Sequence, residues 1–176
     1  MLFRSLVTRG FPVDLQVMHS LTAFAVWIAL GALTVTAGFY ARDAVAFPPL
    51  DVRQRLKDFL ILTKPIIVGL LLVTTFAGMV AGGKAWPSFS LAFWTLLGGA
   101  LAAGGSGAIN QYIDRDLDKN MQRTAKRPLA AGRMTPAEGL SFGLGLSIVS
   151  FYILAGYVNL LAAFLSLAGI LYYVVL

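Results

Sequence analysis

The sequence predicts an all-α protein, a polytopic bundle of transmembrane helices. Hydrophobic residues make up 58% of the 176 residues and charged residues only 12%, with a mean hydropathy of +0.78. A soluble domain carries roughly a quarter of its residues as charges, so that class is excluded. The chain has no cysteine and one histidine, which excludes disulfides, thiolate metal sites and a cage of histidines within the chain.

Five apolar runs are long enough to cross about 30 Å of hydrocarbon as helices. They cover residues 19–40, 65–82, 89–108, 139–156 and 159–176. The first run is too long for the core of a signal peptide, so we expect a retained helix. The last run stops among apolar residues with no flanking charge. We therefore expect about five helices in a truncated chain.

Basic residues gather in two of the connections between these runs. Five lie within residues 41–64 and six within residues 110–138, of fourteen in the whole chain. The positive-inside rule places both connections in the cytoplasm, which predicts a multi-pass protein of the cell membrane. The net charge of +6 therefore reflects topology, and we expect no nucleic-acid partner. Residues 47–58 combine prolines with alternating charges, which predicts an interfacial linker and a short amphipathic lead-in to the second span.

The stretch NQYIDRDLDKNMQRTAKRPL, residues 110–129, is the main candidate for a site. If the third span continues past Gly107, then Asn110, Asp114 and Asp118 project from one helical face at spacings of four residues. Like charges so placed destabilise a helix unless a cation compensates them. Carboxylate and amide oxygens are the ligands that Mg²⁺ prefers, so these three residues are candidate metal ligands. Asp116 points to another face, where we expect it to be solvated.

Cations near this stretch are candidate contacts to a substrate phosphate. Arg123, Lys126 and Arg127 follow it directly, and Lys64 stands where the second span begins. Guanidinium groups bind phosphate oxygens bidentately, whereas the alternative is an ordinary positive-inside loop. For Lys64 the alternative is a lysine that snorkels to the interface. Glycines crowd the preceding helix, which predicts close helix packing or room for a bulky ligand; they are Gly98, Gly99, Gly104, Gly105 and Gly107.

Several motifs resemble one known family. The run N-Q-Y-I-D-R-D-L-D, followed by M-Q-R-T and R-P-L, resembles the first aspartate-rich motif of the UbiA superfamily of intramembrane prenyltransferases. The segments L-T-K-P and G-R-M-T-P-A-E-G are similar as well, and the resemblance covers residues 52–176. Within the superfamily the sequence looks most like the protoheme IX farnesyltransferases, or heme O synthases.

That resemblance implies a bundle of about nine helices around a central cavity, and it implies roles for the candidate residues. Asn110, Asp114 and Asp118 would be catalytic, holding Mg²⁺ and the diphosphate of farnesyl diphosphate. The four candidate cations would contact phosphate or the acceptor. The farnesyl group would pass to a vinyl group of heme b, giving heme O within the lipid bilayer. The family has a second polar region in a later loop, so we expect only the first half of the site here.

The first fifty residues are predicted to be a separate segment, 1–50, before the prenyltransferase part, 51–176. The piece DLQVMHSLTAFAVWIALG, which contains His19, weakly resembles the end of a heme A synthase. A fusion would make heme A synthase a candidate partner. The alternative is a lone interfacial histidine on an anchoring helix.

The residues alone are compatible with three other functions. A UbiA relative could prenylate an aromatic quinone precursor, because the aspartate motif handles only the diphosphate. The acids could instead line a path for a divalent cation in a transporter, although no charged residue continues such a path through a helix centre. A non-catalytic membrane subunit is the third.

Overall fold

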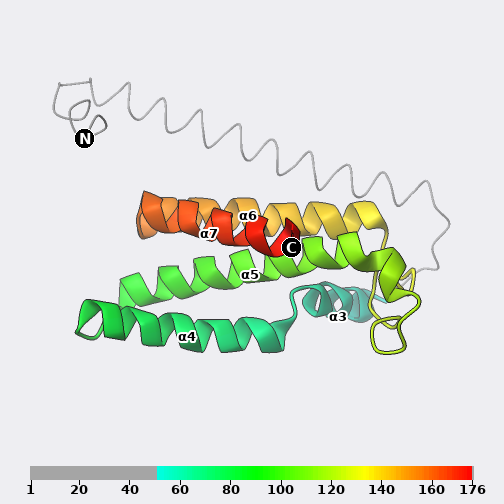
Figure 1. Cartoon of the computed structure of the whole chain (residues 1–176), viewed down its shortest axis with the longest axis horizontal. Coiled ribbons are helices and arrows are strands. Elements are labelled where there is room, and N and C mark those ends of the chain that lie inside the picture. The colour runs from blue at the N-terminus through cyan, green and yellow to red at the C-terminus, as the bar shows by residue number, and fades with distance from the viewer. Residues whose placement is uncertain (1–50, 176) are drawn as a thin grey trace, which may run out of the picture. The chain divides into compact units, whose positions relative to one another are not determined.

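The computed structural model describes residues 51–175, which form helices and no strand in that part of the chain (Figure 1). The helices are α3 (Val52–Leu62), α4 (Pro65–Gly83), α5 (Phe89–Asp118), α6 (Pro136–Tyr157) and α7 (Leu160–Val175). These helices belong to one compact unit. The all-α prediction is confirmed. The predicted span at residues 19–40, the segment 1–50 and His19 lie outside the described residues.

Three helices, α4, α5 and α6, are long and apolar enough to cross a membrane, so the protein is a multi-pass membrane protein. The predicted spans at 65–82, 89–108 and 139–156 correspond to these three helices. The apolar run predicted at 159–176 corresponds to α7, of which the structure describes 16 residues. The side chain of Asn159 accepts the Ala162 amide at 2.7 Å, which places Asn159 before the helix.

Helix α3 is the amphipathic lead-in that the sequence predicts. Its buried residues are Asp58 and Leu62, while Val52 and Leu56 on the other side are exposed. The helix ends because Pro65 has no amide hydrogen and disfavours the right-handed α conformation at the residue before it. Lys64 adopts a left-handed conformation, φ 53° and ψ 61°, and Pro65 opens α4.

The α5–α6 interface is built from small residues. A Cβ added at Gly105 would lie 2.5 Å from Ser147 Oγ and 2.8 Å from the Gly143 carbonyl oxygen. The Ser150 hydroxyl donates to the carbonyl of Gly98 at 2.7 Å, which joins the two helices in a region without charges. Gly98 and Gly105 therefore serve close packing, one of the two uses that the sequence left open.

Helix α6 starts three residues earlier than the apolar run suggests, because a capping box fixes its N-terminus. Thr135 Oγ1 accepts the Glu138 amide at 3.0 Å, and Glu138 Oε2 accepts the Thr135 amide at 2.9 Å. The T-P-A-E sequence carries this signal. The result is a fixed anchor for the segment 119–135, which connects α5 to α6 at the same end of the bundle as α3 (Figure 1).

Candidate functional site at the polar end of the bundle

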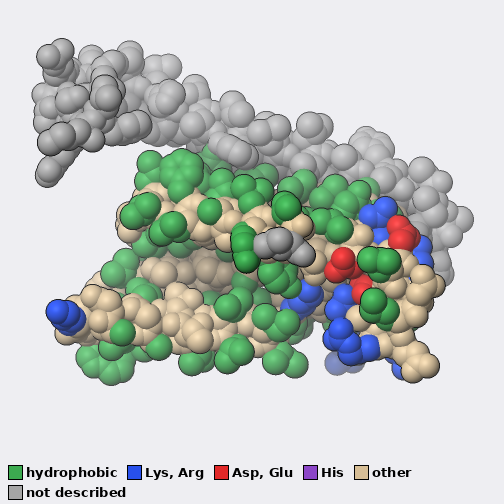
Figure 2. Space-filling model, in the orientation of Figure 1, with side chains coloured by type: hydrophobic (Ala, Val, Ile, Leu, Met, Phe, Trp, Pro, Cys, Tyr) green, Lys and Arg blue, Asp and Glu red, His purple; other side chains and the backbone are tan. Residues whose placement is uncertain are grey.

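Charged side chains gather at one end of the described bundle, over α3, the end of α5 and the segment 119–135 (Figure 2). Three acids there are almost completely buried: Asp58, Asp118 and Glu138 are 0%, 4% and 6% exposed. Each of them has an arginine partner, namely Arg133, Arg127 and Arg55. Topology accounts for exposed cations at a cytoplasmic face, but it gives no reason to bury acids.

Helix α5 continues without a break to Asp118, as the site prediction required. Asn110, Asp114 and Asp118 therefore follow one another on one face, the aspartate-rich face, with a rise of roughly 6 Å from each of the three to the next. Asp116 lies on another face and is exposed, and its carboxylate pairs with Lys119 at 2.8 Å. The predicted separation of Asp116 from the other three residues is confirmed.

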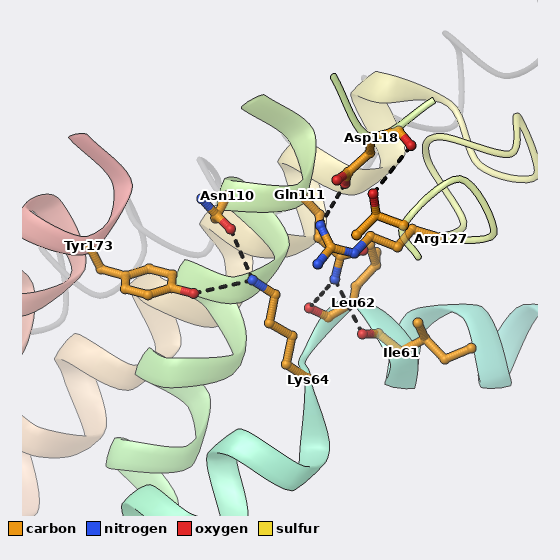
Figure 3. Close-up of polar contacts among 9 residues, drawn as sticks. Ile61, Leu62, Lys64, Asn110, Gln111, Asp118, Arg127 and Tyr173 are labelled. Carbon is orange, nitrogen blue, oxygen red and sulfur yellow. Dashed lines mark hydrogen bonds and ion pairs between the residues drawn. The ribbon is translucent and has the colours of Figure 1, made fainter. Parts of the chain in front are cut away.

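Lys64 reaches the first residue of this face from the break between α3 and α4 (Figure 3). Its Nζ donates to Asn110 Oδ1 at 2.9 Å and to the Tyr173 hydroxyl at 3.2 Å. The same ammonium lies 5.6 Å from the centre of the Tyr173 ring. A left-handed backbone in a residue with a Cβ is unfavourable by about 1–2 kcal/mol. The strain is located where the side chain is directed toward a polar cluster, which is common at functional sites.

Arg127 occupies the other end of the face. Its Nη1 lies 2.6 Å from Asp118 Oδ2, with side chains 23% and 6% exposed respectively (Figure 3). The Thr124 hydroxyl donates to the Asp118 carbonyl at 3.3 Å, which ties the start of the segment 119–135 to the helix end. Arg123 and Lys126 are exposed, and within residues 51–175 their side chains form no hydrogen bond or ion pair. The structure thus brings Lys64 and Arg127 to the predicted face and leaves the other two cations in solvent.

Asp114 lies between these two pairs. It is half-buried, and its carboxylate makes no hydrogen bond or ion pair to another residue in the described range 51–175. It is flanked by an amide oxygen one turn before it and a paired carboxylate one turn after it. Asp114 is therefore the acid of this face whose charge the described residues leave uncompensated.

Gln111 supports the break that presents Lys64. Its side chain is 1% exposed, and Nε2 donates to the carbonyl oxygens of Leu62 at 3.1 Å and Ile61 at 3.3 Å (Figure 3). Near the end of α3 the Ile61 carbonyl also accepts the Lys64 amide at 3.2 Å. Gln111 adds a second donor to that carbonyl and supplies one to the Leu62 carbonyl, which is among the last carbonyls of the helix. The sequence interpretation missed Gln111. The only feature of the sequence that points to Gln111 is its position beside Asn110, at the end of a mostly apolar run.

An apolar cavity of about 340 Å³ lies between α4, α5 and α7, with Lys64 and Tyr173 among its lining residues. Its other walls are mostly aliphatic or small, including Ile67, Leu71, Ala102 and Ile170. Gly99 lines it too, and a Cβ there would meet no atom within 4 Å. Gly99 thus fits the second use predicted for the glycines, room for a ligand. A cavity with apolar walls and a few polar groups suits an amphipathic molecule.

The residues of the face suit a hydrated Mg²⁺ shared with a substrate, but not a site made by protein alone. No group of three or more His, Cys, Asp or Glu residues in the described part of the chain could hold a metal. Mg²⁺ usually keeps several waters and takes one or two carboxylates plus substrate phosphates. Asp114 supplies a free carboxylate and Asn110 an amide oxygen, while Asp118 is engaged by Arg127. The donor set therefore fits a metal that arrives with a phosphorylated substrate.

The fold and the site define the class: a helical multi-pass membrane protein with an oxygen-rich, cationic site beside an apolar cavity. The UbiA prenyltransferase family matches residues 71–176, so the chain belongs to that family. The family resemblance of the motifs is confirmed.

Curated relatives carry the name protoheme IX farnesyltransferase. The protein of Roseiflexus sp. (strain RS-1) is 50% identical over 119 residues, 68% of this chain and 22% of the relative. That of Streptomyces avermitilis is 49% identical over 121 residues, 69% of this chain and 40% of the relative. A relative from Thermus thermophilus is 36% identical over 172 residues, 93% of this chain and 28% of the relative. The chain thus matches between about a fifth and two fifths of their length. No solved structure matches it.

Proposed function

We propose that the protein transfers the farnesyl group of farnesyl diphosphate to a vinyl group of protoheme IX, heme b, and so makes heme O. The relatives supply the reaction, since they are named protoheme IX farnesyltransferase. The observation that carries the proposal is the position of Lys64. Its ammonium lies on the aspartate-rich face and also lines the apolar cavity. A diphosphate with an apolar chain needs both environments side by side.

The polar end would bind the diphosphate through this chain's own cations. Lys64 would contact it as a point charge and Arg127 through its planar fork of donors. Arg123 and Lys126, both exposed, are further candidates for phosphate or for the polar edge of the acceptor. When bound at Asn110, Asp114 and Asp118, Mg²⁺ would neutralise the diphosphate and make it a better leaving group. Asp114 would contribute most to that binding, because Asp118 already has a cationic partner.

The cavity would hold the farnesyl chain and keep water from it. Departure of diphosphate leaves an allylic cation, which water would quench before the acceptor reacts. The mostly apolar walls contributed by α4, α5 and α7 would exclude that water, and the electron-rich ring of Tyr173 would face developing positive charge. Attack by the heme vinyl group and addition of water to the resulting cation would then give the hydroxyethylfarnesyl product.

We place this polar end on the cytoplasmic side of the cell membrane, on the basis of the basic connections. A cysteine introduced at Arg123, which is exposed, tests the placement in the otherwise cysteine-free chain. An impermeant maleimide should label it only after cells are opened. A cysteine at Lys84, at the other end of α4, is the matched control and should label in intact cells.

The reaction itself is tested in membranes that contain the protein made from its complete reading frame. Incubation with Mg²⁺, farnesyl diphosphate and heme b should yield heme O, detected by chromatography and mass. A parallel incubation replaces heme b with hydroxybenzoate. Product from the aromatic acid alone would refute the heme assignment and leave a prenyltransferase of another acceptor. Absence of any farnesyl transfer in both incubations would refute the enzyme proposal itself.

A further inference from the structure

A second buried ion pair lies outside the aspartate-rich face, between α3 and the segment 119–135. The carboxylate of Asp58 is 0% exposed. Arg133 donates to it from Nε at 3.2 Å and 3.1 Å and from Nη2 at 3.0 Å. Gln54, one turn earlier on α3, donates to the same carboxylate at 3.1 Å. Asp58 therefore lies in a well-satisfied site, and it fixes the orientation of the Arg133 guanidinium.

Arg133 also donates to the backbone next to Arg127. Its Nη2 donates to the carbonyl oxygen of Lys126 at 3.1 Å. The residue that follows, Arg127, reaches Asp118 at 2.6 Å. A continuous series of contacts thus runs from Asp58 through Arg133 to the backbone that carries Arg127.

Anchoring of α3 alone does not explain this arrangement. A separate pair, Arg55 with Glu138 at 2.7 Å, already joins α3 to the start of α6. Glu138 belongs to the capping box of α6, so that pair fixes α3 against a helix end. The two pairs share one helix and similar burial, but the Asp58 pair continues through Arg133 to the backbone beside a cation of the site.

We propose that Asp58 and Arg133 are positioning residues that hold the Arg127 guanidinium ready for the diphosphate of the substrate. This inference rests on the proposed function. The Lys126 carbonyl is held by Arg133 just before Arg127, and the Asp118 carboxylate binds the Arg127 guanidinium. Together these contacts restrict the orientations of that guanidinium. A guanidinium ordered before the substrate binds loses less conformational freedom on binding, which favours affinity.

The test compares Asp58→Asn and Arg133→Lys with Arg55→Met, each made in the complete protein. Asp58→Asn removes the charge that orients Arg133, and Arg133→Lys keeps a charge but loses the fork that reaches both partners. Both should raise the KM for farnesyl diphosphate about tenfold and change kcat less than about threefold, the pattern of lost binding shared by ground and transition states. Arg55→Met should leave KM unchanged, although it also breaks an ion pair of α3.

A double-variant cycle separates positioning from general stability. In the background of Arg127→Gln, Asp58→Asn should have no further effect on KM, because the residue it acts through is gone. A merely structural role would give equal and additive increases. Additive effects, or a KM raised as much by Arg55→Met as by Asp58→Asn, would overturn the inference.

Calorimetry on the same purified variants measures the binding of inorganic diphosphate with Mg²⁺. It distinguishes failure of the positioning role from failure of the proposed function. Weaker binding by Asp58→Asn and Arg133→Lys, with Arg55→Met unchanged, supports the positioning role even if no heme O forms. Unchanged diphosphate binding by both positioning variants overturns it even if heme O forms normally. A variant that does not fold is identified by its thermal transition in detergent, and the conservative Arg133→Lys then decides.

Discussion

The two ends of α4 have the same unusual backbone conformation for different reasons. Lys64 precedes the helix with φ 53°, and Lys84 follows it with φ 51°. Lys84 is exposed and closes the helix at its C-terminus, where a left-handed residue is common. Lys64 stands before Pro65 at the N-terminus, and its ammonium binds Asn110 and Tyr173. Helix termination explains the left-handed conformation of Lys84, whereas that of Lys64 coincides with a polar cluster beside a cavity.

The same difference separates the two ends of the whole described bundle. Lys84 is the only charged residue in the 84–88 connection, and the turn after α6 carries none. The other end buries three acids and pairs each with an arginine. Burying ion pairs seldom adds net stability over apolar packing. This difference between the two ends is consistent with the proposal that the polar end binds the substrate, and the predictions below test it.

The largest effect is expected from Asp114→Asn. Asparagine keeps the size of the side chain and removes the negative charge that would bind the metal and its diphosphate. We expect kcat for heme O formation to fall by at least about 100-fold, as for loss of a main electrostatic contact. Asp116→Asn is the matched control, since Asp116 lies on an exposed face of the same motif, and it should keep activity within about twofold. Equal loss in both variants, or none in Asp114→Asn with the fold intact, would contradict the metal role.

Lys64→Gly and Lys64→Met separate the charge of Lys64 from its strained backbone. Both remove the ammonium, so both should raise the KM for farnesyl diphosphate by roughly 10- to 100-fold, the scale of a lost charged contact. Only glycine accepts the left-handed conformation without a steric penalty, so Lys64→Gly should melt at a higher temperature than Lys64→Met. Thermal denaturation in detergent and initial rates measure the two effects. Retained affinity in Lys64→Met would show that the ammonium does not contact the substrate.

Gly99→Leu fills the apolar cavity without touching the polar residues. Because a Cβ at Gly99 meets no atom within 4 Å, the protein should fold normally while the new side chain occupies space for the farnesyl chain. We expect a KM increase of about tenfold for farnesyl diphosphate, the order of effect of crowding an apolar pocket. Gly145→Leu on α6 is the control, since Gly145 also has open space but does not line the cavity. An equal change in both variants would argue against the cavity as the chain-binding site.

The helices and the alignment of the aspartate-rich face could be predicted because both depend on local periodicity. Apolar runs located α4, α5 and α6, and a spacing of four residues placed Asn110, Asp114 and Asp118 together once α5 was continuous. The partners of these residues could not be predicted. Tyr173 lies 109 residues from Lys64, and their contact depends on how α7 packs beside α5.

Buried ion pairs at the polar end show the same limit. Asp58 lies in the stretch 47–58, which predicts an interfacial linker and a short amphipathic lead-in, and Arg133 is 75 residues away. Arg133 lies in the segment that connects α5 to α6, and these two helices pack closely at Gly105 and Gly143. Composition indicates that small residues pack closely, but it does not state which helix they meet. The assignments to substrate and metal remain predictions that the variants above address.

The smallest effect is expected from Lys84→Gly, which completes the comparison of the two ends of α4. Glycine suits the left-handed conformation that ends the helix, and the gain of up to about 1–2 kcal/mol is partly offset by the greater freedom of glycine in the unfolded chain. We therefore expect a slightly higher melting temperature and a KM within about twofold of the parent, because no binding contact is removed. Lys64→Gly should relieve similar strain but lose substrate affinity. If Lys84→Gly impaired transfer as strongly as Lys64→Gly, the proposal that the two ends of α4 differ in function would be wrong.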